Sequence, residues 1–179
     1  REEARHAQRE HRDRVLADLD AAFEAARAYL AASGRAERDA RWEALVPVLE
    51  GALPLFVHAE SADQIRAALA FTARQKVRMI LVGGEEAPDC AEALRERKVP
   101  VVVPETFRLP RRADEAYDAP FTLPERLRKA GLAFCIASSD VWNARNLPYH
   151  AALASAYGLP REEALAAVTR YPAEILGVA

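Results

Sequence analysis

The sequence predicts an α/β fold in which parallel strands alternate with helices. Four short apolar runs lack polar alternation, as strands buried on both faces of a parallel sheet do. These runs cover residues 53–58, 78–83, 99–104 and 132–138. Segments with apolar residues at helical spacing separate them, at 61–75, 85–97 and 123–131. We therefore expect a β-α-β-α-β-α-β order with right-handed crossovers and the strands adjacent in chain order.

The segment before the first strand is predicted to be helical. Residues 1–32 are rich in Ala, Arg and Glu and contain neither Gly nor Pro, which favours one long helix. Its apolar stripe runs from Val15 to Leu30, and the stretch before Val15 is either a solvated extension or frayed. A second helix is expected at about 37–50, so we divide the chain into residues 1–52 and 53–179.

Helices are also expected after the last strand, because apolar residues there recur at helical spacing between punctuating prolines. They cover about 148–157, 161–169 and 172–176. Four strands with helices suit a small doubly wound domain or half of an eight-stranded barrel, and the pattern alone leaves both open.

Composition excludes several classes of partner. Lys and Arg total 25 against 27 Asp and Glu, so the net charge of -2 predicts neither nucleic acid nor an anionic membrane as a partner. No apolar run is long enough to span a bilayer, and no signal peptide is visible, which predicts a soluble cytoplasmic or periplasmic protein. Because the chain begins at Arg1 without a methionine, we expect that a targeting signal upstream would escape notice. The Ala- and Arg-rich composition suggests a bacterial source.

The cysteines indicate neither a disulfide nor a zinc site. Cys90 and Cys135 form no CxxC pair and lie in a helix-like and a strand-like segment. We expect two buried thiols.

Polar residues follow the predicted strands at the edge where both candidate architectures place their sites. His58 ends the first strand and Asp140 follows the last, and imidazole and carboxylate groups suit a divalent cation. The structural alternatives are a hydrogen-bonded histidine and an aspartate that caps the next helix. The sequence has no GxGxxG and no GxxxxGK[ST], and two glutamates follow Gly83-Gly84, which disfavours a nucleotide site.

The tail carries a resemblance to a known family. Its motifs are NARNLPYH from Asn143, AYGLPREEAL from Ala156 and PAEILGV from Pro172, and LPLFVHAESADQIRAAL and ILVGGEEA precede them. From about residue 40 onward, the chain resembles the second half of an amidohydrolase of the imidazolonepropionase and prolidase-like group. The resemblance implies the C-terminal half of a TIM (β/α)8 barrel, with residues 1–52 resembling an insertion before the fifth barrel strand.

The resemblance also implies an activity. His58 matches the metal-binding histidine that ends the fifth barrel strand. Asp140 matches the aspartate of the eighth strand, which binds metal and shuttles the proton of the attacking water. The implied reaction is hydrolysis of an amide-like C–N bond by water activated on a divalent metal, with zinc expected when the barrel is complete.

Two departures from the family pattern count against activity of this chain alone. Gly83 stands where the sixth-strand histidine is expected, and the remaining ligands of the family would lie upstream of Arg1. A catalytic zinc keeps three protein ligands, and this chain matches two. We therefore expect an inactive isolated chain, completed by the missing N-terminal half of the barrel or by another copy. A non-catalytic binding or scaffold module and a free-standing doubly wound domain stay open as alternatives.

Two further residues are candidates for contact with a small-molecule substrate. Arg145 carries a guanidinium that suits a carboxylate, and His150 falls at the expected barrel mouth. The structural alternative is that Arg145 braces the loop and that His150 packs at a helix start. Trp42 and Trp142 are expected to be core or loop anchors.

Overall fold

The computed structural model describes residues 2–32, 38–110 and 115–178. The chain divides into two compact units. The helical unit comprises Arg1–Leu55 with Ala70–Arg78, and the sheet unit comprises Phe56–Leu69 with Met79–Ala179. Helix α3 (Ala62–Arg74) belongs to both, since the division falls within it.

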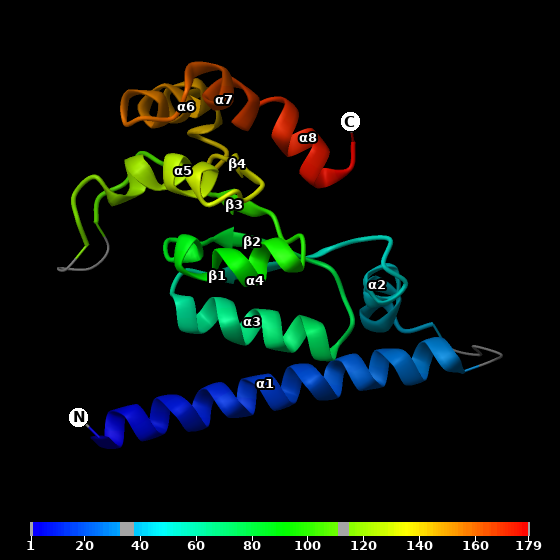
Figure 1. Cartoon of the computed structure of the whole chain (residues 1–179). Helices are drawn as coiled ribbons and strands as arrows, with labels where there is room; N and C mark the ends of the chain where they lie inside the picture. The colour runs from blue at the N-terminus through cyan, green and yellow to red at the C-terminus, as the bar shows by residue number, and fades with distance from the viewer. Residues whose placement is uncertain (1, 33–37, 111–114, 179) are drawn as a thin grey trace. The chain divides into compact units, whose positions relative to one another are not determined.

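The helical unit is built on α1 (Glu2–Ala31) and α2 (Ala40–Leu49), close to their predicted bounds (Figure 1). Phe23 is buried, and its ring meets Phe71 edge-on at a centroid distance of 5.4 Å. Val15, at the start of the predicted apolar stripe, is exposed, so burial of the stripe is confirmed only nearer its end.

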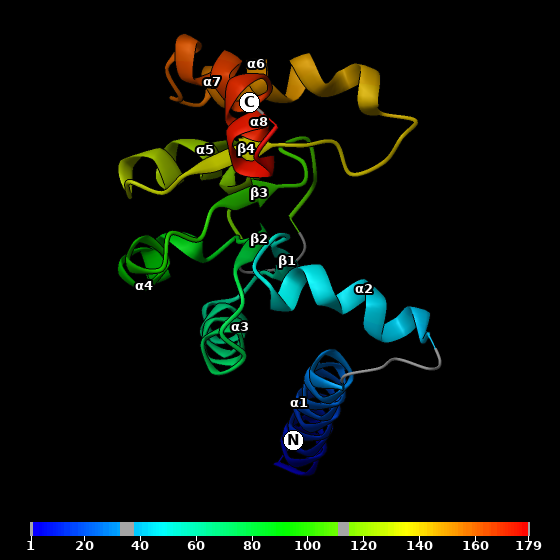
Figure 2. The same ribbon diagram turned by 90° about the vertical axis from the view of Figure 1, so that its right-hand side faces the viewer.

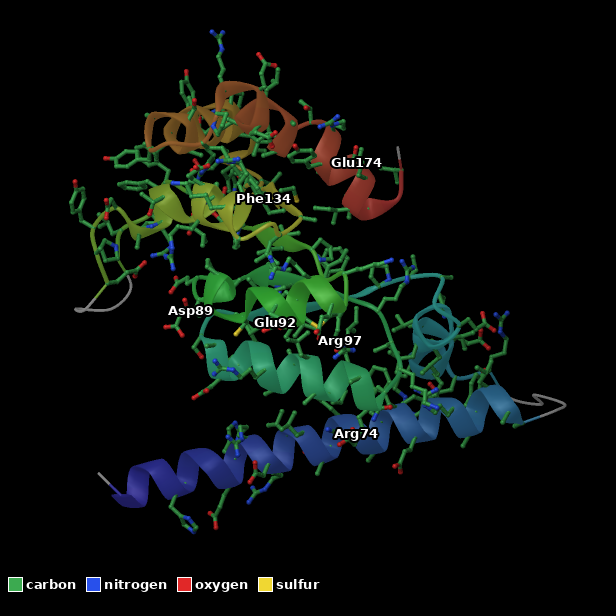
Figure 3. All side chains as sticks on the ribbon, viewed as in Figure 1. Arg74, Asp89, Glu92, Arg97, Phe134 and Glu174 are labelled. Atoms are coloured by element: carbon green, nitrogen blue, oxygen red, sulfur yellow. The ribbon has the colours of Figure 1, made fainter. Side chains whose placement is uncertain are left out.

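Polar contacts add to this packing within the helical unit. Asp20 accepts hydrogen bonds from Nη2 of Arg74 at 2.7 Å and from Nε2 of Gln75 at 2.6 Å. Arg74 is labelled at this position in Figure 3. Asp39 caps α2 by accepting a hydrogen bond from the backbone N–H of Arg41 at 2.9 Å. A carboxylate at that position satisfies a donor that the helix leaves unpaired.

Four strands form one sheet in the order β1-β2-β3-β4 (Figure 2). They are β1 (Leu55–Ala59), β2 (Met79–Gly83), β3 (Val101–Val103) and β4 (Phe134–Ile136). The pairs β2–β3 and β3–β4 are parallel, with Val82 opposite Val102 and Val102 opposite Cys135. The predicted strands and their order are confirmed.

Helices of the sheet unit lie between the strands and after the last strand. They are η1 (Ala87–Cys90), α4 (Ala91–Glu96), α5 (Ala119–Lys129), η2 (Ala144–Asn146), α6 (Leu147–Ala156), α7 (Arg161–Ala167) and α8 (Arg170–Leu176). Helix α5 begins at Ala119, four residues before the predicted start at 123. Pro120 fits the first turn of the helix, because proline lacks only the backbone N–H, and the N–H groups of a first turn have no partner within the helix. The helices α5 to α8 all pack against β4 (Figure 1).

The two faces of the sheet differ in what they contact. Leu81, Val101 and Phe134 belong to the main core cluster with residues of the helices, and the ring of Phe134 lies 6.3 Å from that of Tyr171 in α8 (Figure 3). Val57 of β1 packs against the same cluster. Because successive side chains of a strand point to opposite faces, His58 lies on the face turned away from these helices.

Both cysteines are buried free thiols, as expected. Burial raises the pKa of Cys135 to about 11. Over the part of the chain that is described, none of the helices has the length and apolar character needed to cross a membrane.

Candidate functional site

The carboxyl ends of the strands carry the polar residues singled out in the sequence. His58 is exposed within β1, and Gly83 is buried at the end of β2. Asp140 is exposed in the loop after β4, and Arg145 is exposed in η2. His150 is buried in the first half of α6. The four candidate residues and Gly83 therefore do not share one environment.

Gly83 is covered by a carboxylate. Its φ of +101° lies in a region that L side chains rarely adopt, and a β-carbon built there would be 2.5 Å from Oε2 of Glu60. The same Oε2 accepts a hydrogen bond from the backbone N–H of Glu85 at 3.3 Å. The place where the family resemblance implies a ligand histidine is therefore occupied by the side chain of Glu60.

A buried arginine lies beside this position. Nη2 of Arg108 contacts Oε1 of Glu85 at 2.5 Å and Oε1 of Glu115 at 2.7 Å, and the arginine side chain is only 9% exposed. Arg108 and Glu85, together with Glu60 and Gly83, border a cavity of only about 10 Å³. That space holds about one water molecule, so ion pairs fill this end of β2.

Asp140 binds its own loop. Its carboxylate accepts hydrogen bonds from the backbone N–H of Asn143 at 2.7 Å and from Nδ2 of Asn143 at 2.8 Å. These bonds hold the pKa of Asp140 below 3.8, its ordinary value. The geometry is that of a cap on the turn that leads into η2.

His150 is fixed by the loop after β3. Its Nδ1 accepts hydrogen bonds from the backbone N–H groups of Thr106 at 3.1 Å and Phe107 at 3.3 Å. The hydroxyl of Thr106 donates to the carbonyl oxygen of His150 at 3.0 Å. Since two backbone donors point at Nδ1, that atom carries a lone pair and the proton of the neutral ring is on Nε2. Burial lowers the pKa of His150, and the charge of Glu105 opposes this shift.

A cavity of about 420 Å³ opens beside His150. Its lining residues are Glu105, Phe107, Ser139, Asn143, Asn146, Tyr149 and His150. Oγ of Ser139 donates a hydrogen bond to Oε2 of Glu105 at 2.8 Å. Of the four candidates from the sequence, only His150 belongs to this lining.

The sequence pattern missed the residues that fill the site. Glu60 and Glu105 follow strands β1 and β3, where polar site residues are expected, but no sequence pattern marks Arg108 as the partner of Glu85, 23 positions earlier. The expectation that Trp142 anchors a core or loop is wrong, because its side chain is 83% exposed. It lies in the loop after β4.

Within residues 2–32, 38–110 and 115–178, no three His, Cys, Asp or Glu side chains gather as a metal site requires. His58 and Asp140 are therefore not joined by a third ligand from this part of the chain.

The chain is similar in structure to an amidohydrolase from Thermotoga maritima, with a TM-score of 0.81 and 25% sequence identity. The match covers 91% of this chain and 45% of that one, so this chain spans less than half the length of its relative. A second crystal structure, of an uncharacterized protein, matches with a TM-score of 0.55 and 17% identity, over 73% of this chain and 35% of that one. No protein-family profile and no curated protein sequence matches the chain.

The comparison agrees with the arrangement of strands and helices. A parallel four-stranded sheet with alternating helices has half the strands of an eight-stranded barrel. The chain has an amidohydrolase-superfamily fold, and its coverage of the relative is consistent with the C-terminal half of that barrel.

Proposed function

We propose that this chain is a non-catalytic amidohydrolase-like module that binds a ligand at the carboxyl ends of its strands. The observation that carries the proposal is the carboxylate of Glu60 over Gly83. A histidine at position 83 would have to displace Glu60 and also adopt a backbone conformation that side chains disfavour.

The ion pairs around Arg108 support the same proposal. A catalytic metal supplies positive charge among carboxylates at the ends of the strands. Here the guanidinium of Arg108 supplies positive charge beside Glu85 and Glu115, and its charge is permanent. Because the remaining space is about 10 Å³, a cation with its water ligands has no room beside Gly83.

The test is metal binding by the intact protein. We expect dialysis against zinc, followed by elemental analysis, to leave well below one bound zinc per chain. The value should be unchanged in the His58→Ala and Asp140→Ala variants. Stoichiometric zinc that is lost in both variants would contradict the proposal and favour a metalloenzyme.

The second candidate is part of a metal-dependent hydrolase of C–N, amide-like bonds. The observation that favours it is the place of His58, on the sheet face opposite the helices, which becomes the interior when a barrel closes. Two donors do not complete a site that needs three, so His58 and Asp140 alone do not fit the metal. In this candidate, the N-terminal half would supply the other ligands, and amide hydrolysis would require both halves and zinc.

We also propose a partner for the sheet. In the described sheet, β1 and β4 each pair with one strand only, and strand edges need partners for their N–H and C=O groups. The partner is the N-terminal half of the barrel or another copy of the chain. Sedimentation of this segment alone should show association, and a compact monomer would contradict the proposal.

A further inference from the structure

The cavity of about 420 Å³ contains one buried hydrogen-bond donor whose direction is fixed. His150 is 5% exposed, and its Nδ1 accepts hydrogen bonds from the backbone N–H groups of Thr106 and Phe107. No residue of the described chain accepts a hydrogen bond from Nε2, and every fully buried side-chain nitrogen in that part of the chain has a partner, so Nε2 keeps accessible surface. Because His150 lines the cavity, its Nε2–H is a donor open to a ligand there.

Two amide side chains continue this polar wall. Asn143, Asn146 and His150 all line the cavity, and they follow one another by three and four positions, which is the spacing of neighbours on one side of a helix. Asn146 donates one N–H to Oδ1 of Asn143 at 3.2 Å, and Asn143 donates one N–H to Asp140 at 2.8 Å. Each primary amide has a second N–H, and Oδ1 of Asn146 accepts no hydrogen bond from the described residues, so the wall offers uncharged donors and an uncharged acceptor.

Aromatic surface lies in the same cavity. Phe107 comes from the loop after β3 and Tyr149 from α6, and their side chains are 71% and 68% exposed. The face of an aromatic ring is apolar and carries a negative potential, which attracts polarised C–H groups. A ligand with a flat C–H face would therefore gain from contact with these rings.

The lining disfavours both anionic and wholly apolar ligands. None of its described residues is Lys or Arg, so an anion that leaves water would meet no opposite charge. A wholly apolar ligand would leave the buried N–H of His150 without an acceptor. The cavity therefore suits a neutral ligand that has hydrogen-bonding groups as well as an apolar face.

The spacing of the polar groups favours several hydroxyls on one saturated ring. Side chains three or four positions apart on a helix have their β-carbons about 5–6 Å apart. Hydroxyls at different positions of a six-membered ring can reach groups so spaced, whereas a ligand with one polar group reaches one of them. Each hydroxyl provides one donor and two acceptor positions, which matches a wall of mixed, uncharged groups.

We propose that this cavity binds a neutral pyranoside sugar. Its C–H face lies against the rings of Phe107 and Tyr149. One hydroxyl accepts the hydrogen bond from Nε2–H of His150, and others bond to the amides of Asn143 and Asn146. The inference rests on the proposed binding function and names the ligand class of that module.

The experiment titrates the intact protein with the neutral methyl glycosides of glucose, galactose and mannose, followed by protein-observed NMR. The comparison probes are the methyl glycoside of glucuronic acid, which carries a carboxylate, and benzyl alcohol, which is flat and has one hydroxyl. We expect at least one neutral glycoside to bind at least about fivefold more tightly than both comparison probes, because unmatched polar groups lower affinity by about that factor. No binding of any neutral glycoside, or equal binding of benzyl alcohol, would overturn the inference.

Aromatic variants place the sugar in this cavity. Replacing Phe107 and Tyr149 together by alanine should weaken glycoside binding at least about threefold, because the C–H face loses its contact. Both side chains are largely exposed, so the fold should be kept. Tyr117→Ala is the control, since Tyr117 is 70% exposed and does not line the cavity, and it should leave binding unchanged. Equal affinity in the double variant and wild type, or an equal loss in Tyr117→Ala, would overturn the inference.

Polar variants test the other wall. His150→Asn keeps an acceptor for the loop N–H groups but places no donor at the position of Nε2, so glycoside affinity should fall at least about threefold. Asn146→Leu tests the same wall without changing the contacts of His150, and because the Asn146 side chain caps no N–H of α6, the helix should be kept. It should lower affinity by a similar factor. His11→Asn, at an exposed position of α1, should change nothing, and wild-type affinity in Asn146→Leu and His150→Asn would overturn the inference.

The outcome is separable from that of the proposed function. Without bound zinc, a failure of the glycosides to bind removes only the ligand class. Stoichiometric zinc dependent on His58 removes the non-catalytic proposal, whatever the glycosides do.

Discussion

The carboxylate of Glu60 lies over the α-carbon of Gly83, so close that a β-carbon there would be 2.5 Å from Oε2. Glu60 directly follows β1, and Gly83 ends the neighbouring strand β2. Glycine at 83 leaves the space that the carboxylate of Glu60 fills, and a β-carbon at 83 would push the flexible end of the Glu60 side chain aside. A histidine at position 83 would therefore need Glu60 to turn away and would also have to adopt a positive φ.

Gly83→Ala should destabilise the protein by about 3 kcal/mol, since both the positive φ and the contact with Glu60 oppose a β-carbon. Gly51→Ala is the matched control, because Gly51 has a φ of +76° but nothing within 4 Å of its built β-carbon. The control should cost only about 1 kcal/mol. Urea unfolding of both variants measures the difference, and adding Glu60→Ala to Gly83→Ala should recover part of the loss. Equal costs at both glycines would show that Glu60 is not in the way.

Arg108→Met should destabilise the protein by about 3 kcal/mol, because it leaves Glu85 and Glu115 without their buried guanidinium. The control is Arg66→Met, which removes a pair with Asp63 in which both side chains are exposed. Exposed pairs contribute about 0.5 kcal/mol or less. Thermal or urea unfolding distinguishes the two, and similar losses would argue that the Arg108 network is not buried in solution.

The strands could be predicted from sequence because burial on both faces leaves continuous apolar runs, and Met79–Gly83 is buried at every position. The predicted start of α5 at 123 is four residues too late, and Pro120 in the first turn of the helix resembles a helix breaker in a sequence. The contacts that define the site join distant segments. The pairing of Glu85 with Arg108 depends on how the loop after β3 folds back, which no local pattern encodes.

His58 and Asp140 illustrate the same limit for individual roles. The family resemblance identifies both positions, and strand alternation places His58 on the face away from the helices. Only the loop geometry shows that Asp140 bonds to Asn143. The family motif predicts an aspartate at position 140, whereas the hydrogen-bond partners of Asp140 depend on the turn that follows it.

Asp140→Ala should remove a pH-dependent part of the stability. The folded pKa of Asp140 lies below its ordinary value of 3.8, because Asn143 donates two hydrogen bonds to the charged form. Above about pH 5, Asp140 is charged in both the folded and the unfolded chain, so its hydrogen bonds stabilise the fold fully there. This stabilisation is lost as pH falls through the folded pKa. Urea unfolding of wild type and variant should therefore differ most above pH 5 and converge in acid. A difference that grows in acid would contradict the assignment.

His150 provides a last test, because its neutral ring is required by the loop it holds. Its folded pKa lies below the ordinary value of 6.5, since burial disfavours the imidazolium and a proton on Nδ1 would face the N–H groups of Thr106 and Phe107. As pH falls, His150 is protonated in the unfolded chain before it is protonated in the folded chain. The stability that neutral His150 contributes is therefore complete above pH 6.5 and is lost as pH falls toward the folded pKa. Carboxylates titrate mainly below about pH 5, which leaves the window between about 5 and 6.5 to the histidines.

We expect the unfolding free energy of wild type to fall with decreasing pH in this window and that of His150→Asn to fall less. The His11→Asn control, which alters an exposed histidine, should follow wild type. Nitrogen NMR of the ring at neutral pH should show the proton on Nε2, and a proton on Nδ1 would contradict both the loop geometry and the donor assigned to the cavity.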